Sequence, residues 1–200
     1  MILIDINGID NVGKTYLIDR LVKELQFKNK NVHYVGGVFS MLTNTRGYSE
    51  AEWFLKTPVR ELVAELAYQY TERYKRAKSQ KADIIILDRG ERTIRASLTS
   101  RLRVAGFSRM EANKIVSEHL APEQEYVPRI EIMIKPESLI QVQDIVGEYP
   151  TDYLKYQSFF FNILYTEEES LKNQILFPAF ICIKVQIEKI LKEIEKVEGK

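Results

Sequence analysis

Eight residues near the N-terminus have the types and spacing needed to hold a polyphosphate. Residues 8–15 read GIDNVGKT and match the pattern GxxxxGK[S/T]. In such a loop the glycines let backbone N–H groups approach phosphate, the lysine reaches the β- and γ-phosphates, and the hydroxyl binds Mg²⁺. A glycine turn without a ligand is the alternative. We predict a site for ATP and Mg²⁺ formed by Gly8, Asn11, Val12, Gly13, Lys14 and Thr15.

A second set of candidates follows the apolar run 82–87, where Asp88 and Arg89 stand together. The aspartate can hold Mg²⁺ or orient an acceptor group, and the arginine can bind a phosphoryl group through two hydrogen bonds. Ligands of open α/β sheets lie outside the carboxyl ends of the strands, so this pair should face the same crevice as residues 8–15. Arg73, on the preceding helix, could reach that crevice too. The alternatives are that Asp88 and Arg89 form a structural ion pair and that Arg73 is a solvated arginine on its helix.

The elements that must position these residues alternate between strand and helix. Residues 14–25 carry apolar side chains on one helical face directly after the loop. We predict an α/β fold of three layers, with a parallel sheet of about five strands covered by helices. The expected strands are 1–6, 32–35, 82–87, 130–134 and 174–180, the last at a sheet edge because of Pro178.

Further signals delimit the helices. Residues 50–80 read as helical, with Pro58 marking a kink or a new helix start. Ser108 and Glu111 have the spacing of a capping box for a helix that runs to about His119. The aromatic run 151–168 is typical of a core helix.

Composition excludes some classes of protein. The 200 residues are 45% hydrophobic, and 29 basic against 28 acidic side chains give a net charge of +1. Binding nucleic acid or an anionic membrane through bulk charge needs a basic excess, so neither partner is expected. Cys182 is expected to be a small buried residue in a reducing compartment. Since no apolar run approaches the ~20 residues of a membrane span, we expect one cytoplasmic domain.

At this point the sequence resembles the thymidylate kinase group of P-loop nucleoside monophosphate kinases, and more loosely the deoxynucleoside kinases. ILIDINGIDNVGKTYLIDRL is similar to the family's opening strand, P-loop and helix, QYTERYKRAKSQKADIIILDRG to its arginine-bearing helix and Asp-Arg signature, and EYVPRIEIMIKPESL to its late strand. The resemblance covers most of residues 1–200 and implies a single P-loop kinase domain with a lid at about 136–155. It implies that Asp10 contacts the substrate sugar, that Arg73 and Arg89 bind the acceptor phosphate, and that the chain forms a homodimer.

Three departures from the family pattern are visible. The family's lid carries arginines, whereas residues 136–160 hold only Lys155, and the P-loop has Asn11 or Val12 where some members have arginine. We hypothesise that Arg92 or Arg95 replaces the lid arginine, because the two lie on one helix face after Arg89.

The other two departures concern the acceptor. Gln69 stands where the family often stacks a phenylalanine on thymine, and an amide there could read a base edge, as in the deoxynucleoside kinases. The family's Arg-Glu-Pro loop is absent, with Arg46 as a weak substitute.

The leading interpretation is an Mg-ATP-dependent dTMP kinase that converts dTMP and ATP to dTDP and ADP. Lys14, Asp88, Arg89 and Arg92 would be catalytic, Thr15 and Asp88 would hold Mg²⁺, and Asp10, Gln69, Arg73 and Arg89 would bind the substrate.

Two other interpretations stay open. A deoxynucleoside kinase would need a carboxylate base, for which Asp5, Asp88 and Glu91 are candidates. A nucleotide-binding module with impaired catalysis would explain the lid without arginine.

The balanced net charge conceals two local excesses. Residues 89–103 hold five arginines against Glu91, whereas residues 148–170 hold five acids against Lys155. Solvated helix faces would explain both runs. The sharper hypothesis is that the positive charge needed by a phosphotransferase is concentrated after the Asp-Arg signature and withdrawn from the lid.

Overall fold

The predicted parallel sheet is present, with its strands in the order β2-β3-β1-β4-β5. The computed structural model describes residues 1–38, 42, 47–120, 127–139, 151–166 and 174–199. All four strand pairings within the sheet are parallel, which confirms the predicted fold class. The strands are β1 (Ile2–Asn7), β2 (Val32–Val35), β3 (Ile84–Asp88), β4 (Arg129–Lys135) and β5 (Gln174–Pro178).

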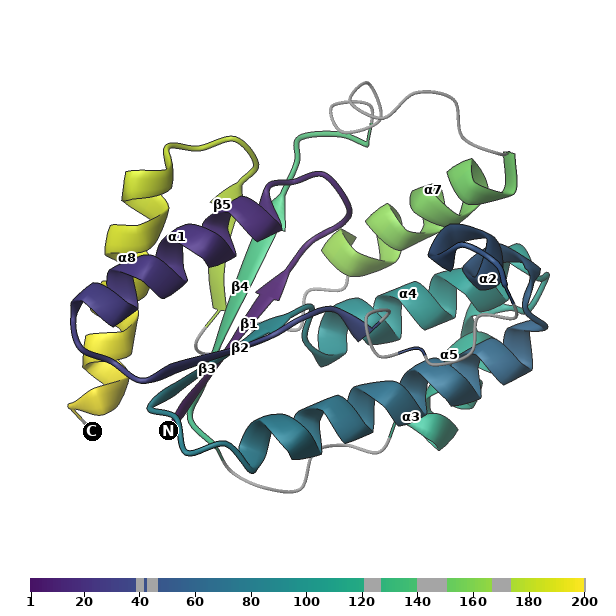
Figure 1. The fold of residues 1–200 in the computed structure, drawn as a ribbon. Helices are drawn as coiled ribbons and strands as arrows, with labels where there is room; N and C mark the ends of the chain where they lie inside the picture. Colours follow the sequence, from purple (N-terminus) through teal and green to yellow (C-terminus); the bar gives the residue numbers. More distant parts are fainter. Residues whose placement is uncertain (39–41, 43–46, 121–126, 140–150, 167–173, 200) are drawn as a thin grey trace.

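Helices cover both faces of this sheet. Figure 1 shows α1 and α8 on one side and α3, α4 and α7 on the other. This arrangement follows from right-handed crossovers between parallel strands, which place a helix against the sheet after each strand. The helices are α1 (Lys14–Phe27), α2 (Glu50–Lys56), α3 (Val59–Lys78), α4 (Glu91–Val104), α5 (Arg109–His119), α7 (Thr151–Thr166) and α8 (Ile183–Glu198).

Local sequence explains where several helices begin. Pro58 is the N-cap of α3, so the helical stretch divides there into two helices. The expected capping box of α5 forms, because the Ser108 side chain accepts from the Glu111 backbone and Glu111 reaches back to the Ser108 backbone. Ser49 and Glu52 make an equivalent box at the start of α2, which the sequence reading missed.

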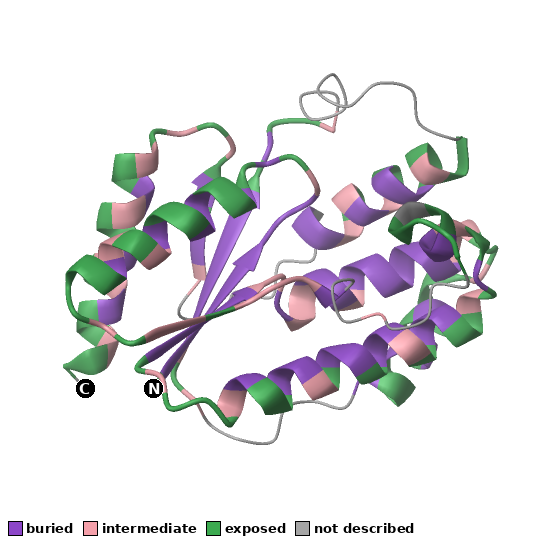
Figure 2. Ribbon diagram, in the orientation of Figure 1, coloured by how far each residue is buried: buried purple, intermediate pink, exposed green. Residues whose placement is uncertain are grey.

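Burial follows the position of each strand in the sheet. All six residues of central strand β1 are buried, whereas β5 alternates between buried and exposed residues. Pro178 ends β5 at the sheet edge, as predicted, where its missing N–H costs no ladder bond. Figure 2 shows the buried class concentrated in the central strands and on the sheet-facing sides of the helices.

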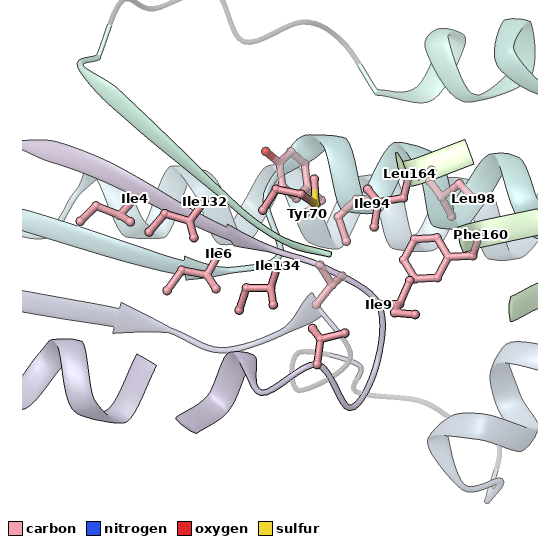
Figure 3. Close-up of a cluster of buried hydrophobic side chains, with 14 of the residues drawn as sticks. Ile4, Ile6, Ile9, Tyr70, Ile94, Leu98, Ile132, Ile134, Phe160 and Leu164 are labelled. Atoms are coloured by element: carbon pink, nitrogen blue, oxygen red, sulfur yellow. The ribbon is translucent and has the colours of Figure 1, made fainter. Parts of the chain in front are cut away.

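The core extends from the sheet to the P-loop, residues 8–15. Ile9 of this loop is fully buried and belongs to the same hydrophobic cluster as Ile94 of α4 and Phe160 of α7. Figure 3 shows these side chains beyond the ends of the strands that carry Ile6 and Ile134. The P-loop is therefore anchored in the same hydrophobic core as α4 and α7.

One prediction about the surface is wrong. Cys182 is exposed and serves as the N-cap of α8, so it is not a buried small residue. Among the described helices, we find none with both the length and the apolar character needed to cross a membrane.

Candidate active site

The P-loop adopts backbone conformations that its sequence makes accessible. Gly8 and Gly13 have φ angles of 146° and 91°, and Asn11 lies in the left-handed region at 63°. A Cβ on Gly8 would lie 2.8 Å from the Ile134 carbonyl oxygen. The close passage of the loop beside β4 therefore requires glycine at position 8.

Tyr165 of α7 fastens this loop to the sheet. Its hydroxyl accepts a hydrogen bond from the Ile9 N–H at 3.0 Å and donates one to the Ile134 carbonyl at 2.7 Å. The hydroxyl thus links a backbone N–H of the loop to a backbone carbonyl of β4. Tyr165 was expected in the core, and its contact with the loop was not predicted.

Lys14 folds back onto its own loop. Its side chain is 7% exposed, and Nζ donates to the Ile9 carbonyl at 2.6 Å. Burial, together with the nearby charge of Arg89, lowers the pKa of Lys14 to about 8, although Asp10 and Asp88 oppose the shift. A phosphate group that displaced the carbonyl would give this ammonium a negatively charged partner. Thr15 follows in the first turn of α1 and is exposed.

Asp88 and Arg89 lie at the carboxyl end of β3, beside the loop. Arg89 has a φ of 69°, and its N–H donates to the Ile6 carbonyl at 3.0 Å. Its guanidinium forms an ion pair and a hydrogen bond with Asp10 of the P-loop. Burial alone would lower the pKa of Arg89, but the Asp10 carboxylate reverses that effect and raises it. The structure therefore brings the two predicted sets of residues together.

Two residues of α7 complete the surroundings of Asp10. Its Oδ2 accepts hydrogen bonds from the Tyr153 hydroxyl at 3.2 Å and from Gln157 Nε2 at 3.3 Å. Burial raises the pKa of Asp10, but the charges of Arg89 and Lys14 and these two bonds outweigh burial and leave it at about 2. Neither α7 residue was predicted. The signal available in the sequence is the i, i+4 spacing of two polar groups within an aromatic helix.

Arg73 lies beside Asp88 and Arg89, at the crevice that it was expected to reach. It is fully buried, and Nη1 donates to the carbonyls of Gly36 at 2.9 Å and Asp88 at 2.7 Å, while Nη2 donates to the carbonyl of Arg89 at 2.5 Å. The planar guanidinium fork thus holds the backbone that presents Asp88 and Arg89. In this structure the two terminal nitrogens of Arg73 bind backbone carbonyls.

A cavity of about 230 Å³, which we call the acceptor cavity, adjoins Asp88 and Arg89. Buried Asp88 Oδ1 has no hydrogen-bond partner among the described residues. A carboxylate oxygen of this kind, together with the Thr15 hydroxyl, fits the preference of Mg²⁺ for oxygen ligands. The apolar wall of the cavity comes from Val38, Leu66, Ile94 and Leu98.

Several predicted residues lie elsewhere. Gln69 is absent from the residues that line the acceptor cavity, and its amide donates to Glu65 Oε1 at 2.8 Å. Arg46 and most of the expected lid, 140–150, fall outside the described residues. Lys155 forms an ion pair with Asp152 at 3.9 Å and is exposed.

The arginines of α4 do not form one cationic pocket. Arg92 and Arg95 line a second cavity of about 420 Å³ together with Asp5 and Glu91. Of the three carboxylates considered as a base, only Asp88 therefore borders the acceptor cavity. The remaining arginines of the run bind backbone carbonyls: Arg101 those of Phe54 and Leu55, and Arg103 that of Phe107. Helical periodicity sends these side chains in different directions, so the positive charge that follows Asp88 is divided among separate contacts.

Comparisons with known proteins give a clear answer at the level of structure. No family model matches the sequence, and no curated protein matches it. Among solved structures, thymidylate kinase from Candida albicans matches with a TM-score of 0.66 and 16% identity, over 98% of this chain and 92% of that chain. That enzyme is described as having broad substrate specificity. This chain has a thymidylate kinase-like fold.

The thymidylate kinase-like fold explains why residues distant in sequence meet. Parallel pairing of β1 with β3 places the P-loop, after Asn7, beside the Asp88 end of β3. Figure 1 shows α7 approaching the same ends of the strands from the other side. Three segments separated by more than 60 residues thereby supply Asp10, Arg89 and Tyr153 to one contact.

Proposed function

We propose that this chain is an Mg-ATP-dependent nucleotide kinase whose acceptor is a nucleoside monophosphate, with dTMP as the first candidate. One observation carries the proposal: a P-loop lysine and the Asp88-Arg89 turn meet at the Asp10 ion pair beside a cavity with apolar walls. Cationic side chains for two phosphate groups thus lie next to a cavity that could hold a base. The thymidylate kinase-like fold supports this interpretation.

The chemistry requires positioning and charge neutralisation rather than a protein nucleophile. Lys14 would exchange the Ile9 carbonyl for β- and γ-phosphate oxygens of ATP. Thr15 and Asp88 would hold Mg²⁺, which neutralises charge on the phosphates when it is bound. An oxygen of the acceptor phosphate then forms a bond to the γ-phosphorus as the bond to the β–γ bridging oxygen breaks, and ADP leaves.

The acceptor side depends on Arg89 and the groups around it. Arg89 would bind the acceptor phosphate, and Asp10 would accept a hydrogen bond from the substrate sugar while Tyr153 and Gln157 hold its other oxygen. Arg73 acts indirectly because its donors hold the Asp88 and Arg89 carbonyls. Whether Arg92 takes part in transfer stays a prediction, since it lines the second cavity.

A deoxynucleoside kinase is the second candidate. It is favoured by Asp88, whose unpartnered Oδ1 could accept the proton of a 5′-hydroxyl. In that reaction the hydroxyl oxygen attacks the γ-phosphorus and its proton passes to the carboxylate. The same residue cannot serve fully as base and Mg²⁺ ligand, so the two candidates make different demands on Asp88.

A coupled ADP-release assay separates the candidates. It would be run with dTMP, dUMP, other monophosphates and free nucleosides, with Lys14→Ala as the blank. Turnover that depends on a monophosphate supports the first candidate, and turnover that depends on a nucleoside supports the second. ATP binding without either activity would leave a nucleotide-binding module and contradict both. The homodimer implied by the family resemblance is tested separately by the mass measured in light scattering.

A further inference from the structure

The second cavity lies on the face of α4 opposite the acceptor cavity and is the larger of the two. Its volume is about 420 Å³, against about 230 Å³ for the acceptor cavity. Ile94, Ser97 and Leu98 of α4 face the acceptor cavity, whereas Arg92 and Arg95 face the second one. The two cavities therefore border the same helix, but apolar residues of α4 line the acceptor cavity and arginines of α4 line the second cavity.

Two neighbouring carboxylates form the floor of the second cavity. Asp5 of β1 and Glu131 of β4 are paired in register and are 3% and 5% exposed. Each carboxylate forms an ion pair with an arginine: Arg129 Nε is 3.5 Å from Asp5, and Arg92 Nε is 3.9 Å from Glu131. Side chains of Arg92 and Arg129 keep 21% and 28% of their exposure, so they reach from the floor to solvent.

The charge of this cavity depends on one proton. The charged groups that line it are Asp5, Glu91, Glu131, Arg92, Arg95 and Arg129. Burial raises the pKa of Glu131 to about 7, although Arg92 opposes the shift. With Glu131 protonated, three arginines face two carboxylates. Because Glu91 accepts a 2.7 Å hydrogen bond from Arg95 and Asp5 lies 3.5 Å from Arg129 Nε, the positive excess falls on Arg92.

Neutral hydrogen-bonding groups also line the second cavity. Thr99 of α4 and Asn113 and Ser117 of α5 line the cavity. A molecule with an anionic group and hydroxyls would find partners for both within one space.

We propose that the second cavity binds a small anionic metabolite, whose phosphate or carboxylate lies between Arg92 and Arg129 and whose hydroxyl groups face α5. The site is distinct from the P-loop but adjoins it through Asn7. This residue donates to Glu131 Oε1 at 3.2 Å and accepts from the Gly90 N–H at 3.0 Å. A Cβ on Gly90 would lie 2.7 Å from the Asp5 Cβ, so the turn after Arg89 rests directly on the cavity floor.

Sulfate is the probe for a tetrahedral anion because it does not titrate in the relevant range, and acetate is the probe for a carboxylate. Calorimetric titrations at pH 6 and pH 8 would use the full chain and the variants Lys14→Ala, Arg89→Gln, Arg92→Gln and Glu131→Gln. We expect one binding event that survives Lys14→Ala and Arg89→Gln, which remove the P-loop and acceptor cations. Saturation by sulfate identifies a phosphate-like ligand, and saturation by acetate alone identifies a carboxylate.

The two cavity variants should act in opposite directions. Arg92→Gln should weaken this event about tenfold, the effect of losing one charge-assisted hydrogen bond. Glu131→Gln removes the titrating carboxylate, so it should bind the anion at pH 8 as tightly as the unmodified chain does at pH 6.

Arg103→Gln, on the same helix but outside the cavity, is the matched control and should change nothing. The proposal is overturned if no saturable event survives Lys14→Ala and Arg89→Gln, or if Arg92→Gln and Glu131→Gln both match the control. If Arg92→Gln does not fold by circular dichroism, the gain of binding in Glu131→Gln at pH 8 decides the question.

Discussion

The two faces of α4 show how one helix can serve two different electrostatic environments. On the acceptor face, Arg89 and Asp10 form a direct ion pair that joins β3 to the P-loop. On the opposite face, Arg92 and Glu131 stand 3.9 Å apart over a buried floor. On the acceptor face, the charges of Arg89 and Lys14 outweigh burial and hold the pKa of Asp10 at about 2, whereas on the opposite face burial raises the pKa of Glu131 to about 7. The run of arginines at 89–103 therefore does not by itself predict the electrostatic environment on either face of α4.

The largest expected effect belongs to the acceptor face. Lys14→Ala removes the ammonium that would neutralise the transferring phosphate, and we expect kcat to fall by about 10²–10³-fold. A steady-state assay with saturating ATP measures this effect. Lys23→Ala, on the exposed side of α1, is the control and should retain full turnover. Equal activity of the two variants would remove the P-loop from the mechanism.

The second cavity is tested by Glu131→Gln. The folded-state pKa of about 7 lies above the ordinary 4.5, so the folded protein holds this proton more tightly than the unfolded chain does. The free energy of unfolding should therefore fall as pH rises from about 4.5 to 7. Glu131→Gln should remove that fall, a gain of about 3 kcal/mol above pH 7 on the basis of ~1.4 kcal/mol per pKa unit.

Urea denaturation at pH 5 and pH 8 measures this difference. A glutamine oxygen can still accept from Asn7, so the hydrogen bond at Oε1 is retained. Glu188→Gln, at an exposed position of α8, is the control. A gain that is equal at both pH values would mean that the carboxyl is not the group that titrates.

The role of Arg73 separates positioning from direct binding of the acceptor. Arg73→Lys replaces a planar fork by one ammonium, which cannot serve three carbonyls, so we expect a stability loss of about 2 kcal/mol. We also expect a fall in kcat larger than the rise in the KM for the acceptor. Arg76→Lys, exposed on the same helix, is the control. Unchanged stability with a raised acceptor KM alone would instead place Arg73 on the substrate.

The smallest effect concerns pH. Because the pKa of Lys14 is lowered to about 8, the free protein loses the ammonium as pH rises through that value. Affinity for ATP should therefore decline by about tenfold between pH 7 and pH 9. Isothermal titration with Mg-ATP across this range is the measurement. Lys14→Arg keeps its charge, and its affinity should not vary with pH.

Local patterns were enough to predict the elements and one half of the candidate site. The strand, glycine loop and helix around residues 8–15 follow from short-range periodicity and from the need for glycine where the backbone turns. The break at Pro58 and the cap at Ser108 are equally local. Contacts that depend on packing escaped prediction: Tyr165 with Ile9, and Tyr153 and Gln157 with Asp10.

The sequence by itself determined the order of strands and helices and the chemistry of the P-loop, because hydrophobic periodicity and glycine are properties of neighbouring residues. The tertiary structure decided where each charge is used. It directed Arg73 to backbone carbonyls, paired Arg89 with Asp10 and turned Arg92 towards Glu131. The physical reason is that a long cationic side chain binds whichever acceptor the packed elements bring within reach, and that acceptor lies between 15 and 79 residues away along the chain.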